Sequence, residues 1–224
     1  MFIVLEGLDG AGKSTQIQYL QDYFLQSQQK SNFIHFPRFD APLYGPLIAQ
    51  FLRGELGAID QVSPQLVALI YAGDRHDAAP QIRKWLQEGN VVIADRYVYS
   101  NVAYQCAKLD QPDKQRELRD WILQMEYTFF NLPKPTLNLF LDVPLAFVAQ
   151  QLHTPRDGDD RAYLNGKRDI HESNLTYQEK VRDVYLLQKE LDTQFKVIPC
   201  GDTAGVMLGA HDIYHRIKST INQY

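Results

Sequence analysis

A glycine-rich stretch near the start of the chain constrains its fold more than any other feature. Residues 7–14 match the pattern GxxxxGK[ST]. An apolar run, Phe2–Leu5, precedes the stretch, and a helical pattern begins at Lys13. This strand–loop–helix order is the setting in which the pattern binds the phosphates of a nucleoside triphosphate. The predicted nucleotide-binding residues are Gly7, Leu8, Asp9, Gly10, Ala11, Gly12, Lys13, Ser14 and Thr15.

The residue types of this loop suit phosphate chemistry. Glycines let the backbone curl so that its N–H groups point at phosphate oxygens, and the helix that follows adds the positive end of its dipole. Lys13 is expected to reach the β- and γ-phosphates, and the hydroxyl of Ser14 to ligate Mg²⁺. The alternative is an ordinary glycine-rich turn before a helix, which the strand–loop–helix setting disfavours.

Short apolar runs alternate with longer helical patterns along the chain. The runs are predicted to be strands buried on both faces of a sheet: Phe2–Leu5, Phe33–Phe36, Val91–Ala94, Leu137–Leu141 and Phe195–Ile198. Two predicted helices are placed only by their starts, at Lys13 and after Pro144. Four others are predicted over full ranges: Pro64–Leu86, Gln115–Phe129, Tyr177–Leu191 and Val206–Ile221. The alternation predicts an α/β fold with a parallel sheet covered on both faces. Ligands of such sheets bind at the carboxyl ends of the strands.

Composition narrows the range of partners. The chain has 224 residues, 45% of them hydrophobic, which is enough to bury a core without disulfides. A net charge of −4 and the absence of a long basic run disfavour a nucleic-acid polymer as partner. No apolar run approaches the length of a membrane span, and the first residues lack the basic start of a signal peptide. Two distant cysteines fit a reduced chain, so we expect a cytoplasmic protein without a membrane partner.

Charged residues follow two of the predicted strands. Asp95 ends the run Val91–Ala94, where an acid beside the phosphate loop acts on Mg²⁺ or its water. Arg96 comes next, Arg38 follows the second run, and Arg75 lies in a helical pattern. Each arginine alone reads as a surface residue. Because arginine forks match phosphate and base-edge acceptors, the three together favour a second anionic ligand.

One segment, residues 153–169, breaks the alternation of strands and helices. It is charged, contains glycine and has almost no aliphatic residues. Two interpretations stay open from its composition: a solvated surface loop, or a lid that closes over a ligand.

Beyond these patterns, the sequence resembles the thymidylate kinases along nearly its whole length. The matching pieces are Glu6–Thr15, Phe36–Arg38, Asp74–Arg75, Asp95–Gln105 and Leu132–Pro135 leading into Leu139–Val143. The Phe-Pro-Arg piece and the Asp-Arg-Tyr…Ser…Ala-Tyr-Gln piece are specific to that family, whereas many families share the phosphate loop. The resemblance implies one domain over residues 1–224 with a three-layer P-loop NTPase fold, strand order 2-3-1-4-5 and a lid near residues 153–169.

The resemblance also implies roles at a dTMP site. Arg38 binds the dTMP phosphate with Arg96 beside it, and Tyr71 stacks on thymine, although core packing is the alternative for Tyr71 and Tyr104. Arg75 donates to thymine O4, and Asn101 contacts the base. Asp9 meets the 3′-hydroxyl of the sugar. The implied substrate-binding residues are Asp9, Phe36, Pro37, Arg38, Tyr71, Arg75, Arg96, Ser100, Asn101, Tyr104 and Gln105.

The implied reaction is transfer of the γ-phosphoryl group of MgATP to dTMP. The acceptor phosphate is already mostly dianionic at neutral pH, so cations and alignment matter more than a base. The implied catalytic residues are Lys13, Asp9, Arg38, Arg96, Arg156 and Arg161. Some family members carry an arginine inside the phosphate loop where this chain has Gly10, so the lid is expected to supply it. The lid residues are Arg156, Arg161, Lys167, Arg168, Asp169 and Glu172, and the implied metal ligands are Ser14 and Asp95.

Two further expectations concern partners and rivals. The resemblance implies a homodimer formed by helices on one face of the sheet. Apolar positions in Pro64–Leu86 and Asn101–Ala107 could serve this interface or belong to the core, and the sequence leaves both open. The nearest alternative function is a deoxynucleoside kinase, whose neutral acceptor needs a carboxylate base and no acceptor-phosphate arginine. A P-loop ATPase or switch protein is the more distant alternative.

Overall fold

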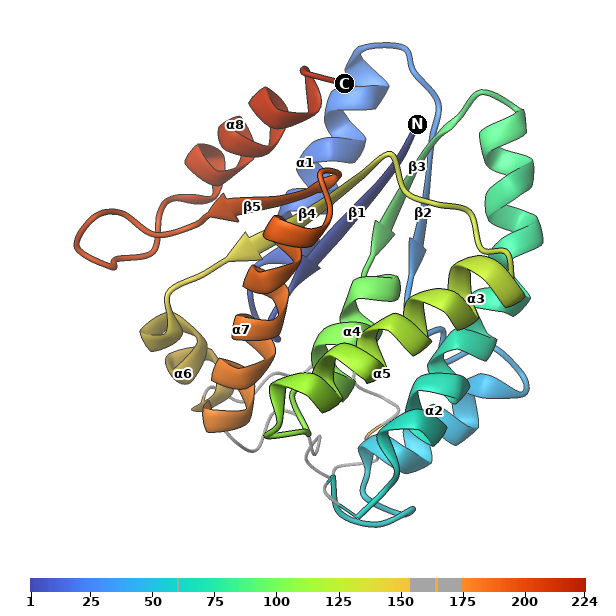
Figure 1. Ribbon diagram of the computed structural model, residues 1–224. Coiled ribbons are helices and arrows are strands. Elements are labelled where there is room, and N and C mark those ends of the chain that lie inside the picture. Colours follow the sequence, from blue (N-terminus) through green and yellow to red (C-terminus); the bar gives the residue numbers. More distant parts are fainter. Residues whose placement is uncertain (60, 154–163, 165–174) are drawn as a thin grey trace.

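Five parallel strands form one sheet in the order β2-β3-β1-β4-β5 (Figure 1). The structure is a computed structural model and describes residues 1–59, 61–153, 164 and 175–224. The strands are β1 (Phe2–Gly7), β2 (Ser31–His35), β3 (Val91–Asp95), β4 (Leu137–Asp142) and β5 (Phe195–Pro199). The predicted parallel sheet and strand order are confirmed. All five strands end at the same edge, where the phosphate loop follows β1.

Burial divides the strands into two groups. The central strands β1, β3 and β4 are buried along almost their whole length, as their continuous apolar runs predict. The prediction was wrong for β2 and β5, which form the two edges of the sheet and are partly exposed; Phe33 in β2 is 41% exposed. An edge strand has a neighbour on one side only, so part of its surface meets solvent.

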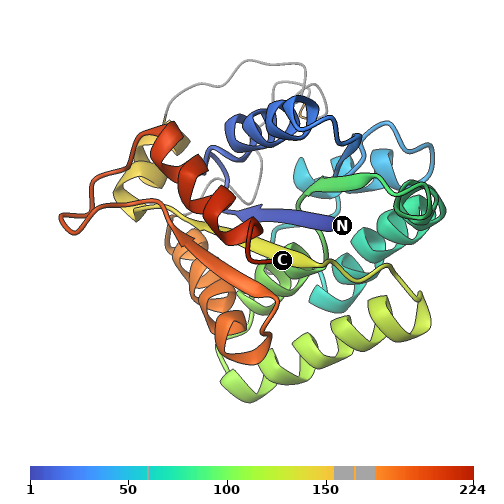
Figure 2. The same ribbon diagram turned by 90° about the horizontal axis from the view of Figure 1, so that it is seen from above.

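Helices cover both faces of the sheet (Figure 2). Helices α1 (Lys13–Gln26) and α8 (Ala210–Ile221) lie together on one face. The other face carries α3 (Pro64–Gln87), α4 (Val98–Cys106) and α7 (Leu175–Leu191), and α5 (Pro112–Gln124) packs outside α4. The remaining helical elements are α2 (Tyr44–Leu52), the π-helix η1 (Met125–Phe129) and α6 (Leu145–His153). Among the residues described, none of the helices is both long and apolar enough to cross a membrane.

Some helix boundaries differ from the sequence prediction. Helices α2 and α4 were not predicted, because each is only nine residues long, which is too short for a helical period to stand out in the sequence. Helix α5 starts earlier than predicted, with Pro112 in its first turn. Helix α8 starts at Ala210 instead of Val206. Before it, the Asp202 carboxylate accepts the N–H groups of Ala204 and Val206, which closes a turn that excludes a helix.

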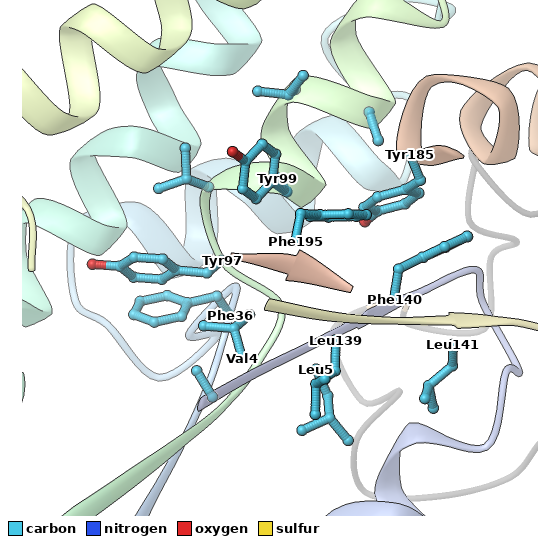
Figure 3. Packing of buried hydrophobic residues seen from close by; sticks show 14 of the residues in the cluster. Val4, Leu5, Phe36, Tyr97, Tyr99, Leu139, Phe140, Leu141, Tyr185 and Phe195 are labelled. Atoms are coloured by element: carbon cyan, nitrogen blue, oxygen red, sulfur yellow. The ribbon is translucent and has the colours of Figure 1, made fainter. Parts of the chain in front are cut away.

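The core sits on both sides of the central strands (Figure 3). Phe140 of β4 stacks on Tyr185 of α7 with ring centroids 4.5 Å apart, and Phe195 of β5 lies beside them. Leu139 and Leu141, the alternate residues of β4, point to the opposite face together with Leu5 (Figure 3). This two-sided packing fixes the carboxyl edge of the sheet, from which the functional residues project.

Candidate active site

The phosphate loop wraps the start of α1 as the sequence predicts. Gly10 and Gly12 have φ angles of 78° and 80°, a left-handed conformation that glycine adopts without steric cost. Gly12 is also the N-cap residue of α1, so the loop delivers the free N–H groups of the first helical turn to a cleft of about 840 Å³. Residues 9–15 all line this cleft.

Lys13 lies at the floor of the cleft between the loop and β3. Its Nζ donates to the carbonyl of Leu8 over 3.4 Å and lies 3.8 Å from Asp95 Oδ1. Burial and the positive charge of Arg96 lower the pKa of Lys13. Burial would raise the pKa of Asp95, but the charge of Lys13 and the hydrogen bond from His35 outweigh it and lower that pKa. Asp95 is therefore a carboxylate at neutral pH.

Ser14 and Asp95 have the donor atoms that a magnesium ion needs. Asp95 Oδ1 is buried and has no hydrogen-bond partner within the described ranges, and Ser14 lies on the wall of the cleft. Hydroxyl and carboxylate oxygens suit Mg²⁺, which usually takes one or two protein ligands and completes its shell with phosphates and water. The described residues include no cluster of three His, Cys, Asp or Glu side chains. The residues therefore fit a nucleotide-bound Mg²⁺.

Arg96 adopts an unusual backbone conformation that aims its side chain into the cleft. Its φ is 66°, which costs a non-glycine residue about 1–3 kcal/mol. The Arg96 N–H donates to the carbonyl of Leu5 over 2.9 Å. The guanidinium donates to Asp9 over 2.6 Å, to Ser100 Oγ over 3.2 Å and to the Tyr104 hydroxyl over 3.3 Å. These contacts hold a permanent cation beside the phosphate loop.

Asp9 turns away from the phosphate cradle toward α4 and α7. Besides Arg96, its carboxylate accepts from the Tyr104 hydroxyl over 2.9 Å and from Gln178 Nε2 over 3.3 Å. Burial raises the pKa of Tyr104 well above its usual value, so the hydroxyl keeps its proton and donates it to Asp9. Tyr177 donates in turn to the backbone carbonyl of Tyr104.

Glu6, one residue before the loop, is linked to Arg96 through Ser100, whose hydroxyl bonds to both side chains. The side chain is completely buried. Its Oε1 accepts the N–H groups of Tyr97 and Ser100 over 3.0 and 3.1 Å, which satisfies the first turn of α4. Its Oε2 accepts from the hydroxyls of Ser100 and Tyr185. A strand residue thus caps the helix that carries the predicted substrate residues.

The far part of the cleft is built around a buried ion pair. Arg75 of α3 is 2% exposed and donates to Glu126 of η1 through Nε and Nη2 over 2.5 and 2.7 Å. Asn101 of α4 donates to the same carboxylate over 2.8 Å. Other predicted residues line the cleft here: Phe36, Pro37, Tyr71, Ser100, Tyr104 and Gln105.

Comparison with known proteins identifies this arrangement. The family model for thymidylate kinase matches residues 5–204. The chain belongs to the thymidylate kinase family. A probable thymidylate kinase of Thermococcus kodakarensis is 32% identical over 204 residues, covering 88% of each chain. The thymidylate kinase of Mycobacterium tuberculosis is 30% identical over 83% of this chain and 84% of its own. The solved thymidylate kinase of Candida albicans superposes with a TM-score of 0.73 at 26% identity, over 99% of this chain and 91% of that one.

In this kinase the side chain of Arg38 bonds to two aspartates of α3, a position that the sequence analysis did not predict. Its Nε donates to Asp74 over 2.9 Å, and its Nη2 donates to Asp77 over 2.6 Å and to the Asp74 carbonyl. Its backbone N–H also donates to Asp74. Arg38 is absent from the residues that line the cleft. Its role at a substrate phosphate stays a prediction.

Two other predictions about this kinase concern the lid and the dimer interface. The predicted lid residues Arg156, Arg161, Lys167, Arg168, Asp169 and Glu172 lie outside the described residues. The apolar positions of Asn101–Ala107 were left open between a dimer interface and the core, and every residue in this segment is buried within this chain. The structure therefore assigns this segment to the core, because α4 sits between the sheet and α5.

Among the described residues of the kinase site, those that escaped the sequence analysis include Glu6, His35, Glu126 and Gln178. Each acts by bonding to a predicted residue: Glu6 to Ser100, His35 to Asp95, Glu126 to Arg75 and Gln178 to Asp9. Glu6 belongs to the matching piece at the phosphate loop, so its place there was the available signal. Glu126 lies in a predicted helix and carries no local signal, because its partner is 51 positions away.

Proposed function

We propose that this kinase uses MgATP to phosphorylate dTMP, with the whole chain acting as one domain. Membership of the family makes the protein a dTMP kinase that forms dTDP. The observation that supports the site assignment is a single cleft that contains both a phosphate loop and the Arg75–Asn101 pocket. A donor and an acceptor nucleotide can therefore meet inside it.

The chemistry asks for charge neutralisation and alignment. The dTMP phosphate has a second pKa of about 6, so it attacks as a dianion without a general base. Lys13, Arg96 and the N–H groups of the loop offset the repulsion between the two phosphates. Ser14 and Asp95 would hold the Mg²⁺, which supplies further positive charge when bound. Asp9, fixed by Tyr104, accepts a hydrogen bond from the sugar hydroxyl.

The arginines expected at the transferred phosphoryl group come from the predicted lid. Gly10 offers none from the loop. We assign this role to Arg156 and Arg161, with Lys167, Arg168, Asp169 and Glu172 as further lid residues, and we assign Arg38 to the dTMP phosphate. An arginine on the transferred group accelerates such reactions about 10³-fold or more. The assignment fails if Arg156→Ala and Arg161→Ala both leave kcat within about twofold.

The proposal includes a homodimer in the cytoplasm. Helix α3 supports the dimer, because Leu66 and Leu69 are 60% and 45% exposed. Sedimentation velocity of the protein and of a Leu66→Glu, Leu69→Glu variant tests it. Cys106 and Cys200 are free and buried, in keeping with a reducing compartment.

An assay of ADP release with a panel of acceptors tests the proposed reaction. We expect dTMP to be used far better than dCMP, dGMP, UMP and thymidine, with dUMP as the nearest competitor. A preference for thymidine would indicate a deoxynucleoside kinase. ADP release that is independent of any acceptor would indicate an ATPase.

A further inference from the structure

Glu126 connects the two cleft residues that face the predicted base pocket. It is completely buried at the π-helical turn η1, which is closed by the bond from the Phe130 N–H to the Met125 carbonyl over 2.9 Å. One carboxylate oxygen accepts from Arg75 Nη2 and from Asn101 Nδ2, and the other accepts from Arg75 Nε. A single carboxylate therefore holds two side chains from two different helices.

These bonds determine which way the amide of Asn101 points. Its Nδ2 donates to Glu126 over 2.8 Å and to the backbone carbonyl of Ala68 over 3.0 Å. Both partners can only accept, so a rotated amide would set its oxygen against two other oxygens. The amide oxygen Oδ1 is left buried and without a partner in the described part of the chain, on a residue that lines the cleft. Asn101 therefore offers an acceptor to a ligand.

Arg75 offers the opposite group. A guanidinium can only donate, and its two bonds to Glu126 fix its plane. An acceptor on Asn101 and a donor on Arg75 match the N3–H and O4 of thymine or uracil. Cytosine carries an acceptor at N3 and an amino donor at C4, so both contacts would be mismatched. Mismatched buried polar groups give strong discrimination.

We propose that Glu126 is a positioning residue that sets the preference of this kinase for thymine over cytosine. It acts through Asn101 and Arg75 and touches no substrate itself. The inference rests on the proposed function, because it concerns the acceptor nucleotide of that reaction.

The test is the near-isosteric substitution Glu126→Gln, which replaces one acceptor oxygen by a donor amide. The amide of Asn101 then loses its fixed orientation. We expect the ratio of kcat/KM for dTMP to that for dCMP to fall about tenfold or more. The ratio for dTMP to dUMP should stay constant, because the two bases share N3–H and O4. Both ratios are independent of the fraction of folded enzyme, so a loss of stability cannot mimic the result.

Two variants serve as controls. Glu126→Asp keeps both acceptor oxygens and should retain the preference for dTMP over dCMP even if its kcat/KM is lower. Glu117→Gln changes an exposed glutamate on α5 and should leave both ratios unchanged. If Glu126→Gln yields no folded protein, the double variant Arg75→Met, Glu126→Gln removes the unpaired charge. It is compared with Arg75→Met alone, so that the further loss of preference we expect reports on Glu126 and not on the missing guanidinium.

The outcomes separate the two levels of the proposal. A wild-type enzyme that does not prefer dTMP to dCMP would contradict the proposed function. Given that preference in the wild type, the role of Glu126 alone would be overturned if Glu126→Gln keeps it within about twofold, or if the double variant keeps the dTMP-to-dCMP ratio of Arg75→Met within about twofold.

Discussion

Arg96 and Asp9 form an ion pair at the mouth of the phosphate loop, with 2.6 Å between Nη2 and Oδ1. The pair joins the residue that follows β3 to the loop that follows β1. Because Asp9 also bonds to Tyr104, the carboxylate holds Arg96 in place before any substrate arrives. In the proposed reaction an incoming phosphate would find the cation already oriented, which would lower the cost of reorganisation.

Replacing Arg96 by lysine should show how much this orientation matters. Lysine keeps the charge but cannot contact Asp9, Ser100 and Tyr104 together, because it lacks the planar fork. We expect Arg96→Lys to lower kcat about 10²-fold or more, measured as ADP release at saturating ATP and dTMP. Arg116→Lys, which changes a 71% exposed arginine on α5, is the matched control. A kcat within about threefold of wild type would mean that charge alone suffices.

Glu6 should make the stability of the kinase depend on pH. Burial raises the pKa of Glu6, although its hydrogen bonds and the charge of Arg96 act against this. The unfolded chain therefore releases the proton first as the pH rises. The Glu6 contribution to the free energy of unfolding is full below about pH 4.3 and is lost as the pH passes through the raised pKa.

The measurement compares wild type with Glu6→Gln by urea unfolding at several pH values from about 4 to about 8. The difference in unfolding free energy, wild type minus variant, should fall as the pH rises. A difference that grows with pH would contradict the raised pKa. The glutamine side chain of the variant cannot titrate, so the comparison isolates this one group.

Two aspartates, Asp74 and Asp77, bond to the guanidinium of Arg38. A substrate phosphate would have to compete with them for this cation. Asp77 is 57% exposed and bonds only the outer nitrogen of the guanidinium, whereas Asp74 is buried. We expect Arg38→Ala to raise KM for dTMP about tenfold, and Asp77→Asn to leave it unchanged or lower it. Neither should change KM for ATP. If Arg38→Ala leaves KM for dTMP within about twofold, Arg38 serves to tie its loop to α3.

Asp95 provides a test of the metal site. We expect activity to disappear with a chelator and to return with Mg²⁺. Asp95→Asn should require about tenfold more Mg²⁺ for half-maximal activity, because one anionic ligand or outer-sphere contact is removed. Titration of Mg²⁺ at fixed ATP checks this. An unchanged Mg²⁺ requirement would assign Asp95 to the support of Lys13 alone.

Sequence patterns predicted the parts of this molecule whose structure depends on residues adjacent in the chain. The run Val91–Ala94 and the loop after β1 are contiguous, so their fold could be inferred from neighbouring residues. The strand order came from the family resemblance instead. Phe33 is exposed because its strand lies at an edge of the sheet. A short apolar run in the sequence does not show whether its strand lies at an edge or in the centre.

In the candidate site, too, residues within contiguous motifs were predicted and their partners from distant segments were not. Lys13, Arg96 and Asn101 were predicted because they lie in motifs, and the structure brings all three to one cleft. Their partners were not predicted, because ion pairs such as Arg75 with Glu126 join distant helices. Arg38 illustrates the limit most clearly: the motif placed it at a strand end, but two aspartates on α3 decide where its side chain lies.

The capping of α4 by Glu6 has a consequence for the speed of the reaction. Strand β1, which leads into the phosphate loop, and helix α4, which lines the same cleft, are joined by the bonds of one carboxylate. The proposed donor and acceptor sites would thus be spaced when the chain folds, not when substrates bind. In the proposed reaction each substrate would meet a fixed frame, and this frame would give the acceptor phosphate a high effective molarity beside the γ-phosphate.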